Sequence, residues 1–210
     1  MSSPDDMVRL FRQLLALKST PRTGWLDRGM PPGETESIAD HILMATLIGW
    51  LAADASLDRD RVLKLALVHD LAEAITGDPP PYARDHVPPA SETEALREFF
   101  ARRHVRSTED KAAKDHAEGE AMERLRALMP AQIGEEIVEL WHEYEEGATP
   151  EARFAKDVDR FEAFLQARDY ARRYPDLPFD GFTRMAEQEL QTPALIALRD
   201  AILAKESPGS

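Results

Sequence analysis

Apolar residues recur at helical spacing along nearly the whole chain, and this periodicity is the strongest constraint on the fold. No segment shows the alternating, β-branched and aromatic pattern of a strand, and no long internal repeat is visible. The sequence therefore predicts an all-α protein. The clearest stripes are Val8, Phe11, Leu14 and Leu15; Ile38, His41, Ile42, Ala45, Ile48 and Ala52; and Val62, Leu65, Ala66, His69 and Glu73.

Helix-start signals divide the second half of the chain. Ser91 and Ser107 are each followed three residues later by an acidic residue, as in a capping box, and Thr149 precedes Pro150. We expect helices at 91–104, 107–128, 131–146, 150–173 and 193–205. Three segments rich in Pro or Gly are predicted to be irregular: 19–35, 77–90 and 174–182, the last joining a final helical pair.

The chain has 210 residues, with 26 Lys and Arg against 39 Asp and Glu, so its net charge is −13. This length suits a single domain, 1–210, with a core at about 8–173 and a C-terminal helical appendage at about 176–205. Such an acidic chain is a poor partner for a nucleic acid polymer, and its apolar runs are too short for a membrane span. Because the N-terminus also lacks a targeting signal, we expect a soluble, cytoplasmic protein.

Histidines and carboxylates gather around one apolar run. His69 and Asp70 follow the apolar segment 65–68, Glu73 comes one helical turn later, and Asp78 lies in the turn beyond. Burying adjacent ionisable groups is costly unless they are paired or bind a metal. A lone histidine such as His41 is more often a satisfied core residue, but this density favours a divalent cation. With no cysteine in the chain, imidazole and carboxylate must be the ligands.

These residues resemble the HD-domain metal-dependent phosphohydrolases, an all-α superfamily, and in particular their 5′-deoxynucleotidase-like branch. The resemblance runs from about residue 10 to about residue 170. It rests on the segments 17–25, 36–41, 65–78, 121–122, 140–145, 154–162 and 165–167. It implies a single HD domain with His41, His69, Asp70 and Asp159 as metal ligands.

The fourth ligand has an alternative in this sequence. The family's ligand lies three residues after a Lys, which selects Asp159 after Lys156, whereas the apolar stripe of this helix points closer to Asp157. We follow the motif, and a helix buried on two sides would reconcile both observations. Two His and two carboxylates suit Mn²⁺, Co²⁺, Fe²⁺, Ni²⁺ or Zn²⁺.

The remaining site residues are assigned from their chemistry together with the resemblance. Glu73 and Asp78 are expected to be catalytic, exchanging protons with the water or the leaving oxygen. Arg22 is the expected phosphate clamp, because its planar fork takes two phosphate oxygens. Trp25 is expected to stack against the sugar or base. The implied reaction is hydrolysis of a deoxyribonucleoside 5′-monophosphate to the deoxyribonucleoside and phosphate.

Two other readings stay open on the sequence. The same metal site would also serve another substrate: a phosphodiester, a nucleoside triphosphate or a non-nucleotide phosphomonoester. A triphosphate should require clustered basic residues, and beyond Arg22 only Arg28 and Arg84 are candidates. The second reading is a non-catalytic nucleotide-binding helical module with a structural metal, although a degenerate site should have lost Glu73, Asp78 or a ligand.

Three further expectations concern the surroundings of the site. The helix at 91–104 looks longer than this branch usually has and lies after the catalytic loop, where it would act as a lid. Trp141 and Tyr144 are expected in the core and His142 on the surface. A homodimer is implied by the resemblance, with the C-terminal helix at 194–203 as a candidate interface.

Overall fold

The computed structural model describes residues 2–89, 91–102 and 104–206, and within these ranges it is helical with no strand. One isolated antiparallel β-bridge joins Pro21 and Ser37. The all-α prediction is therefore confirmed. No helix in the described part of the chain is long and apolar enough to cross a membrane.

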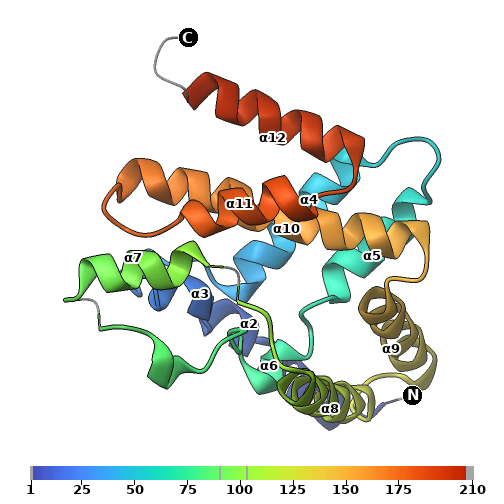
Figure 1. Ribbon diagram of the computed structural model, residues 1–210. Coiled ribbons are helices and arrows are strands. Elements are labelled where there is room, and N and C mark those ends of the chain that lie inside the picture. The colour runs from blue at the N-terminus through green and yellow to red at the C-terminus, as the bar shows by residue number, and fades with distance from the viewer. Residues whose placement is uncertain (1, 90, 103, 207–210) are drawn as a thin grey trace.

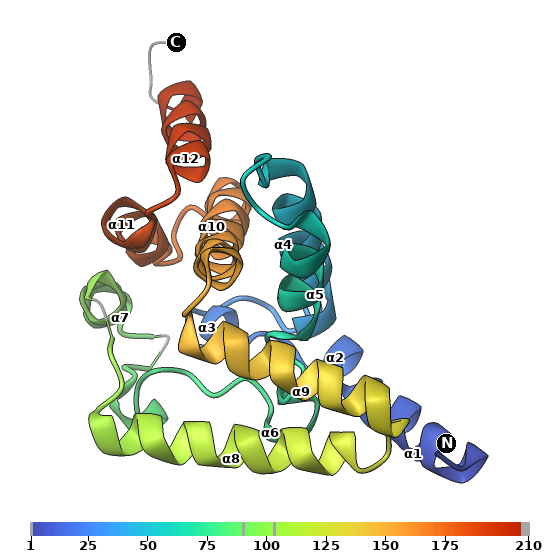
Figure 2. The same ribbon diagram turned by 90° about the vertical axis from the view of Figure 1, so that its right-hand side faces the viewer.

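Three helices form the centre of the molecule: α4 (Ile38–Ala52), α5 (Arg59–Val68) and α10 (Pro150–Arg173). Each starts at a side-chain cap, from Ser37, Asp58 and Thr149 respectively, so the sequence fixes where each helix begins. The three helices pack against one another (Figures 1 and 2). They position the site: His41 lies in α4, Asp159 lies in α10, and His69 directly follows the last residue of α5.

A second group of helices closes one end of this centre. It consists of α1 (Pro4–Leu14), α2 (Ala16–Ser19), α6 (Glu73–Thr76), α8 (Thr108–Arg126) and α9 (Ala131–Glu146). In Figure 2, α8 and α9 run across the lower end of the molecule. Leu65 of α5, Met122 and Leu125 of α8, and Trp141 of α9 share one buried cluster with other apolar residues. The expectation that Trp141 and Tyr144 are core residues is confirmed, since both are buried, whereas His142 is exposed.

The chain beyond α10 folds back as α11 (Asp180–Glu189) and α12 (Pro193–Glu206). Both helices pack against α10; in Figure 2, α11 lies on the side opposite α4 and α5, and α12 lies above α10. Ala186, Leu190 and Leu195 join Val158 and Phe164 of α10 in a second buried cluster. The long helix α10 is therefore covered on two sides. The helix α11 starts at Asp180, inside the segment predicted to be irregular.

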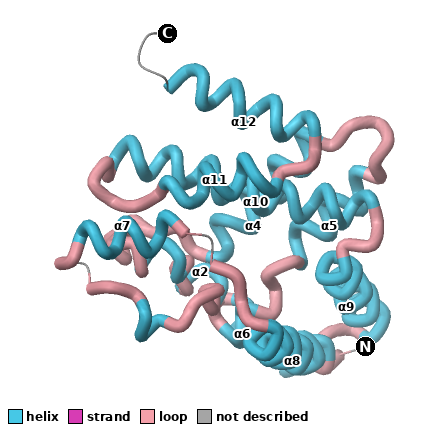
Figure 3. Tube along the Cα trace, viewed as in Figure 1, coloured by secondary structure: helices cyan, strands magenta, loops and turns pink. Residues whose placement is uncertain are grey.

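The segment between α6 and α8 is mostly loop (Figure 3), with one 3₁₀ turn at Arg84–His86 and the helix α7 (Thr93–Ala101). The extra helix exists but is shorter than the predicted 91–104, and residues 90 and 103 lie outside the described part. The expected cap at Ser91 is wrong. The amide of Glu92 donates to the carbonyl of Pro89, so Ser91 belongs to a turn before the helix.

A second difference concerns the run from His69 to Glu73, which the apolar stripe predicted as one continuous helix. The helix α5 ends at Val68, and His69 to Ala72 form turns before α6. The amides of Leu71 and Glu73 donate to carbonyls only three residues back. His69 and Asp70 therefore lie in tightly wound turns between α5 and α6, and not within a continuous helix.

Candidate metal centre and active site

The rings of His41 and His69 meet in the core between α4 and the end of α5. Their Nε2 atoms lie 3.2 Å apart, and both residues are buried. His41 Nδ1 lies 2.5 Å from the Glu162 carboxylate, and His69 Nδ1 lies 2.7 Å from the carbonyl oxygen of Ala66. Both partners accept hydrogen bonds, which assigns the proton of each neutral ring to Nδ1. The Nε2 lone pairs then face each other, an arrangement that favours a cation between them.

Two carboxylates complete this arrangement. Asp159 Oδ1 of α10 lies 3.2 Å from His41 Nε2, and Asp70 Oδ2 lies 3.2 Å from His69 Nε2 and 3.7 Å from His41 Nε2. His41, His69 and Asp159 each offer a ligand atom within 4.8 Å of the others. Two nitrogen and two oxygen donors converging in this way fit a first-row divalent cation.

Asp157, the alternative ligand, lies elsewhere. One of its carboxylate oxygens accepts hydrogen bonds from the amides of Gln191 and Thr192 and from the Thr192 hydroxyl, at 2.7 to 2.8 Å. It therefore holds the start of α12. The structure brings Asp159 to the histidines and turns Asp157 toward the C-terminal helices, because α10 is buried on both sides.

The electrostatics of the centre favour a positive charge. Burial and the Arg22 charge oppose protonation of His41, yet Asp159 and Glu162 raise its pKa to about 10. Burial disfavours the ionised form of Asp70, but His69 and Arg22 hold the pKa of this carboxyl well below its usual range. The centre thus attracts a cation, whether a proton on the ring or a metal ion.

Arg22 joins the centre from the loop that precedes α3 (Thr23–Leu26). Its Nη1 donates to Asp70 Oδ2 at 2.8 Å, and its Nε lies 3.9 Å from Asp78 Oδ2. The same Asp78 oxygen accepts the amide of Thr23 at 2.6 Å. Burial opposes the charge, but Asp78 and Asp70 raise the pKa of Arg22 well above its usual value. Asp78 therefore holds the Arg22 segment against the end of α6.

Glu73 brings a buried carboxyl group to the cavity beside the centre. It is buried, and its Oε2 has no hydrogen-bond partner among the described residues. Burial and the charges of Asp70 and Asp78 raise the pKa of Glu73 well above its usual value. A carboxyl group whose pKa is raised in this way is suited to donating a proton.

Trp25 lies deeper than a stacking residue would. Trp25 is only 2% exposed. Its ring packs edge-on against Tyr170 and lies tilted against Phe182, at a centroid distance of 4.3 Å from the latter. The indole Nε1 donates to Glu36 Oε1 at 2.6 Å. Trp25 still lines the cavity described below, so it offers an edge to that space and anchors α3 to the core.

Sequence reasoning missed two residues beside the centre. Glu162 orients His41, and it lies three positions after Asp159, a spacing that places both on one side of a helix. Tyr144 donates its hydroxyl to Asp159 Oδ2 at 3.3 Å and packs its ring 5.2 Å from that of His69. Its apolar stripe indicated a core residue and gave no signal for this hydrogen bond.

A cavity of about 630 Å³ opens next to the centre. Its lining includes Arg22, Asp70, Glu73, Asp78 and Asp159, together with residues of α7, of α11 and of the stretch Pro79–Tyr82. This volume lies in the range of small-molecule sites. The extra helix α7 is thus one wall of the cavity, and Figure 1 shows it next to α11.

The basic residues of the cavity are largely engaged with neighbours. Arg102 pairs with Glu98 and Lys114 with Glu118, while Arg106 donates to the carbonyl of Pro79. Of the two weaker candidates for a triphosphate site, Arg28 lines the cavity, whereas Arg84 is exposed and pairs with Asp27.

Residues 14–194 match the model of the HD domain family, which defines the class of this protein. The 5′-deoxynucleotidase HDDC2 of Mus musculus is 35% identical over 164 residues, which are 78% of this chain and 69% of that protein. The 5′-deoxynucleotidase hdd1 of Schizosaccharomyces pombe is 38% identical over 165 residues, 77% of this chain and 70% of that protein.

Solved structures agree with the sequence comparison. The PH0347 protein from Pyrococcus horikoshii OT3 has a TM-score of 0.62 at 26% identity, covering 93% of this chain and 97% of its own. The chain therefore belongs to the HD-domain metal-dependent phosphohydrolases, in their 5′-deoxynucleotidase branch.

Proposed function

We propose that this protein hydrolyses deoxyribonucleoside 5′-monophosphates to the deoxyribonucleoside and inorganic phosphate. Water adds to phosphorus, the bond from phosphorus to the 5′ oxygen breaks, and that oxygen takes a proton. The observation that carries this proposal is the convergence of two imidazoles and two carboxylates beside a guanidinium at the end of a cavity. Relatives named 5′-deoxynucleotidase supply the substrate class.

His41, His69, Asp70 and Asp159 would hold the divalent metal, which is Mn²⁺, Co²⁺, Fe²⁺, Ni²⁺ or Zn²⁺. Such an ion polarises a phosphoryl oxygen and lowers the pKa of bound water. Glu162 and the carbonyl of Ala66 fix the two rings with their Nε2 atoms inward.

The chain's own residues supply the remaining chemistry. Arg22 donates to two phosphate oxygens, exchanging one of its carboxylate partners for the substrate. Glu73 donates a proton to the departing 5′ oxygen, and the proton that the attacking water releases restores the acid form of Glu73. Asp78 keeps Arg22 in place through the Thr23 amide. Trp25 contacts the sugar through the edge that lines the cavity.

A phosphate-release screen tests this function. Ribo- and deoxyribonucleoside mono-, di- and triphosphates are each incubated with metal-stripped protein and each of the five metals in turn. We expect release from deoxyribonucleoside monophosphates only with metal present. Release from no monophosphate under any metal would refute the proposal, and release only from triphosphates would support the alternative substrate.

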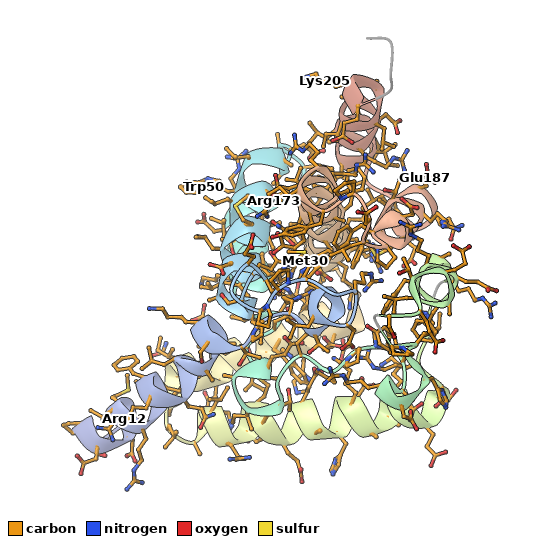
Figure 4. All side chains as sticks on the ribbon, turned by 90° about the vertical axis from the view of Figure 1, so that its left-hand side faces the viewer. Arg12, Met30, Trp50, Arg173, Glu187 and Lys205 are labelled. Atoms are coloured by element: carbon orange, nitrogen blue, oxygen red, sulfur yellow. The ribbon has the colours of Figure 1, made fainter. Side chains whose placement is uncertain are left out.

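We also propose a homodimer, formed through the outer face of α4. Leu43, Leu47, Trp50 and Leu51 form one stripe on this helix, with Trp50 54% and Leu51 85% exposed. Figure 4 shows Trp50 at the outer edge of the molecule. No Asp, Glu, Lys or Arg occurs between Asp40 and Asp54, and His41 is buried, so two copies of this acidic chain can approach here and pair about a twofold axis.

The C-terminal helix is a weaker interface than the sequence indicated. Leu195 is buried, and Ile202 and Leu203 of α12 pack against the chain's own second core cluster. We expect Trp50→Glu to convert the dimer to a monomer in light scattering, whereas Leu198→Glu on α12 leaves it intact. A monomeric wild-type protein would contradict the proposal.

The proposed setting is the cytoplasm, where free nucleotides are the substrate and neither a nucleic acid polymer nor a membrane is a partner. A net charge of −13 repels polyanions and anionic lipid surfaces. We expect no binding to duplex DNA or to phosphatidylserine vesicles at physiological salt, and a fluorescent fusion spread through the cytoplasm. Measurable binding to either, or a localised fusion, would contradict this setting.

A further inference from the structure

One cation is buried in the wall of the cavity between two aromatic rings. The guanidinium carbon of Arg28 lies 4.0 Å from the ring centroid of Phe100 on α7 and 4.4 Å from that of Phe182 on α11. Arg28 is only 8% exposed, and all three residues line the cavity. The two rings hold the plane of the guanidinium in a fixed orientation.

The known contacts of Arg28 leave donors for a ligand. Its Nε donates to the carbonyl of Pro178 at 3.1 Å and its Nη1 to the carbonyl of Gly24 at 2.7 Å. These bonds use two of five N–H donors. Tyr82 offers a further partner, and Asp27, the neighbouring carboxylate, is engaged by Tyr82 and Arg84. No ion pair to Arg28 occurs within the described residues.

The charge on Arg28 persists at neutral pH. Burial lowers the pKa of Arg28, but only to about 10. A buried, charged donor strengthens any hydrogen bond it makes and disfavours a ligand that presents another donor. Arg28 therefore discriminates between groups that accept and groups that donate.

The position of Arg28 relative to Arg22 fits a nucleotide. Arg22 directly precedes α3 and contacts Asp70 among the metal-ligand candidates, whereas Arg28 follows the end of α3 by two residues. The helix α3 is a single turn of four residues, roughly 6 Å long, so the two arginines leave the chain at opposite ends of a segment no longer than a nucleotide. Gly24 and Trp25 line the cavity between these two arginines.

We propose that Arg28 is a specificity-determining residue that donates to a carbonyl oxygen of the substrate's nucleobase. This inference rests on the proposed function and adds a base preference to it. Bases with an oxo group at purine position 6 or pyrimidine position 4 are favoured over adenine and cytosine, which present an amino group there. For purines, O6 and N7 together accept the fork of an arginine, whereas the amino group of adenine opposes it.

The test compares dIMP with dAMP, whose bases differ in the group at position 6 and in the proton that accompanies it on N1. We expect kcat/KM of the wild type to be roughly tenfold or more higher for dIMP, the discrimination of one bidentate pair. In Arg28→Met the ratio falls to near one. Because both substrates are measured on the same preparation, any loss of folded protein cancels from the ratio. Arg184→Met, at an exposed cavity residue of α11, is the matched control and keeps the wild-type ratio.

The outcomes separate the two proposals. A wild-type ratio near one, or a ratio unchanged in Arg28→Met, would overturn the role of Arg28 while leaving the hydrolase intact. A ratio lost in Arg184→Met instead would also overturn it. If Arg28→Met does not fold, Arg28→Lys keeps the charge without the planar fork and should lower the ratio. Absence of phosphate release from both nucleotides and from 2-deoxyribose 5-phosphate would refute the proposed function itself.

Discussion

Replacing Glu162 by Gln tests how the protein prepares His41 for a metal. The Glu162 carboxylate lies 2.5 Å from His41 Nδ1, and the two side chains are 3% and 0% exposed. The amide keeps the size of the side chain and an acceptor oxygen. It removes the negative charge that strengthens this hydrogen bond and makes Nε2 a better ligand.

The expected magnitude follows from the burial of the pair. Loss of such a partner lowers metal affinity by roughly 10- to 100-fold, or about 1.4 to 2.7 kcal/mol. We expect the upper half of this range. A hydrogen bond to a charged group contributes about 1.5 to 3 kcal/mol, and water cannot replace the lost charge at a fully buried ring.

Calorimetric titration of Mn²⁺ into metal-stripped protein measures the effect. Glu143→Gln is the matched control, because Glu143 is also a buried glutamate but bonds to Arg61 and Thr149. It should bind Mn²⁺ as the wild type does. Equal affinity in Glu162→Gln and the wild type would show that Glu162 does not tune His41, and would refute this reasoning.

Three further predictions concern stability. Asp157→Asn weakens three hydrogen bonds at the start of α12 and should cost about 1 to 3 kcal/mol in urea unfolding without changing Mn²⁺ affinity; wild-type stability would contradict this. The Arg61 hydrogen bond lowers the pKa of Glu143 from 4.5, so its stabilisation is present above pH 4.5 and lost as pH falls through the folded-state pKa. Glu143→Gln should therefore flatten the acid limb of the unfolding free energy, and an unchanged limb would refute this. Gly181→Ala places a Cβ 2.5 Å from a carbonyl oxygen of α7 and should cost about 1 to 3 kcal/mol, whereas Gly33→Ala, in open space, lowers the melting temperature little; equal melting temperatures would contradict it.

Local signals explain how much of the fold was predictable. The bounds of α9 and α10 match the predicted 131–146 and 150–173, because Thr149 and Pro150 start α10 and Gly147, at φ 63°, ends α9. The start of α7 was missed because a turn through Pro89 overrides the serine signal. The break after Val68 left no mark in the apolar stripe, since the tighter turns keep the same residues inward.

In the site, too, residues that are close in the sequence could be grouped from it, whereas contacts made only by the packing of distant helices could not. The sequence grouped His69, Asp70, Glu73 and Asp78, which lie close together along the chain. Periodicity could not decide whether Asp159 or Asp157 is the fourth ligand, because α10 is covered on both sides and both of its faces carry buried residues. The pairing of Glu162 with His41 spans 121 residues and follows only from the packing of α10 on α4.

The central claim is that Asp159, together with His41, His69 and Asp70, holds a catalytic metal. The most direct measurement is the metal content of Asp159→Asn and Asp157→Asn after dialysis against Mn²⁺, with phosphate release from a deoxyribonucleoside monophosphate measured on the same samples. We predict that Asp157→Asn keeps both the metal and the activity, and that Asp159→Asn loses both. Retention of metal and turnover by Asp159→Asn would contradict the account.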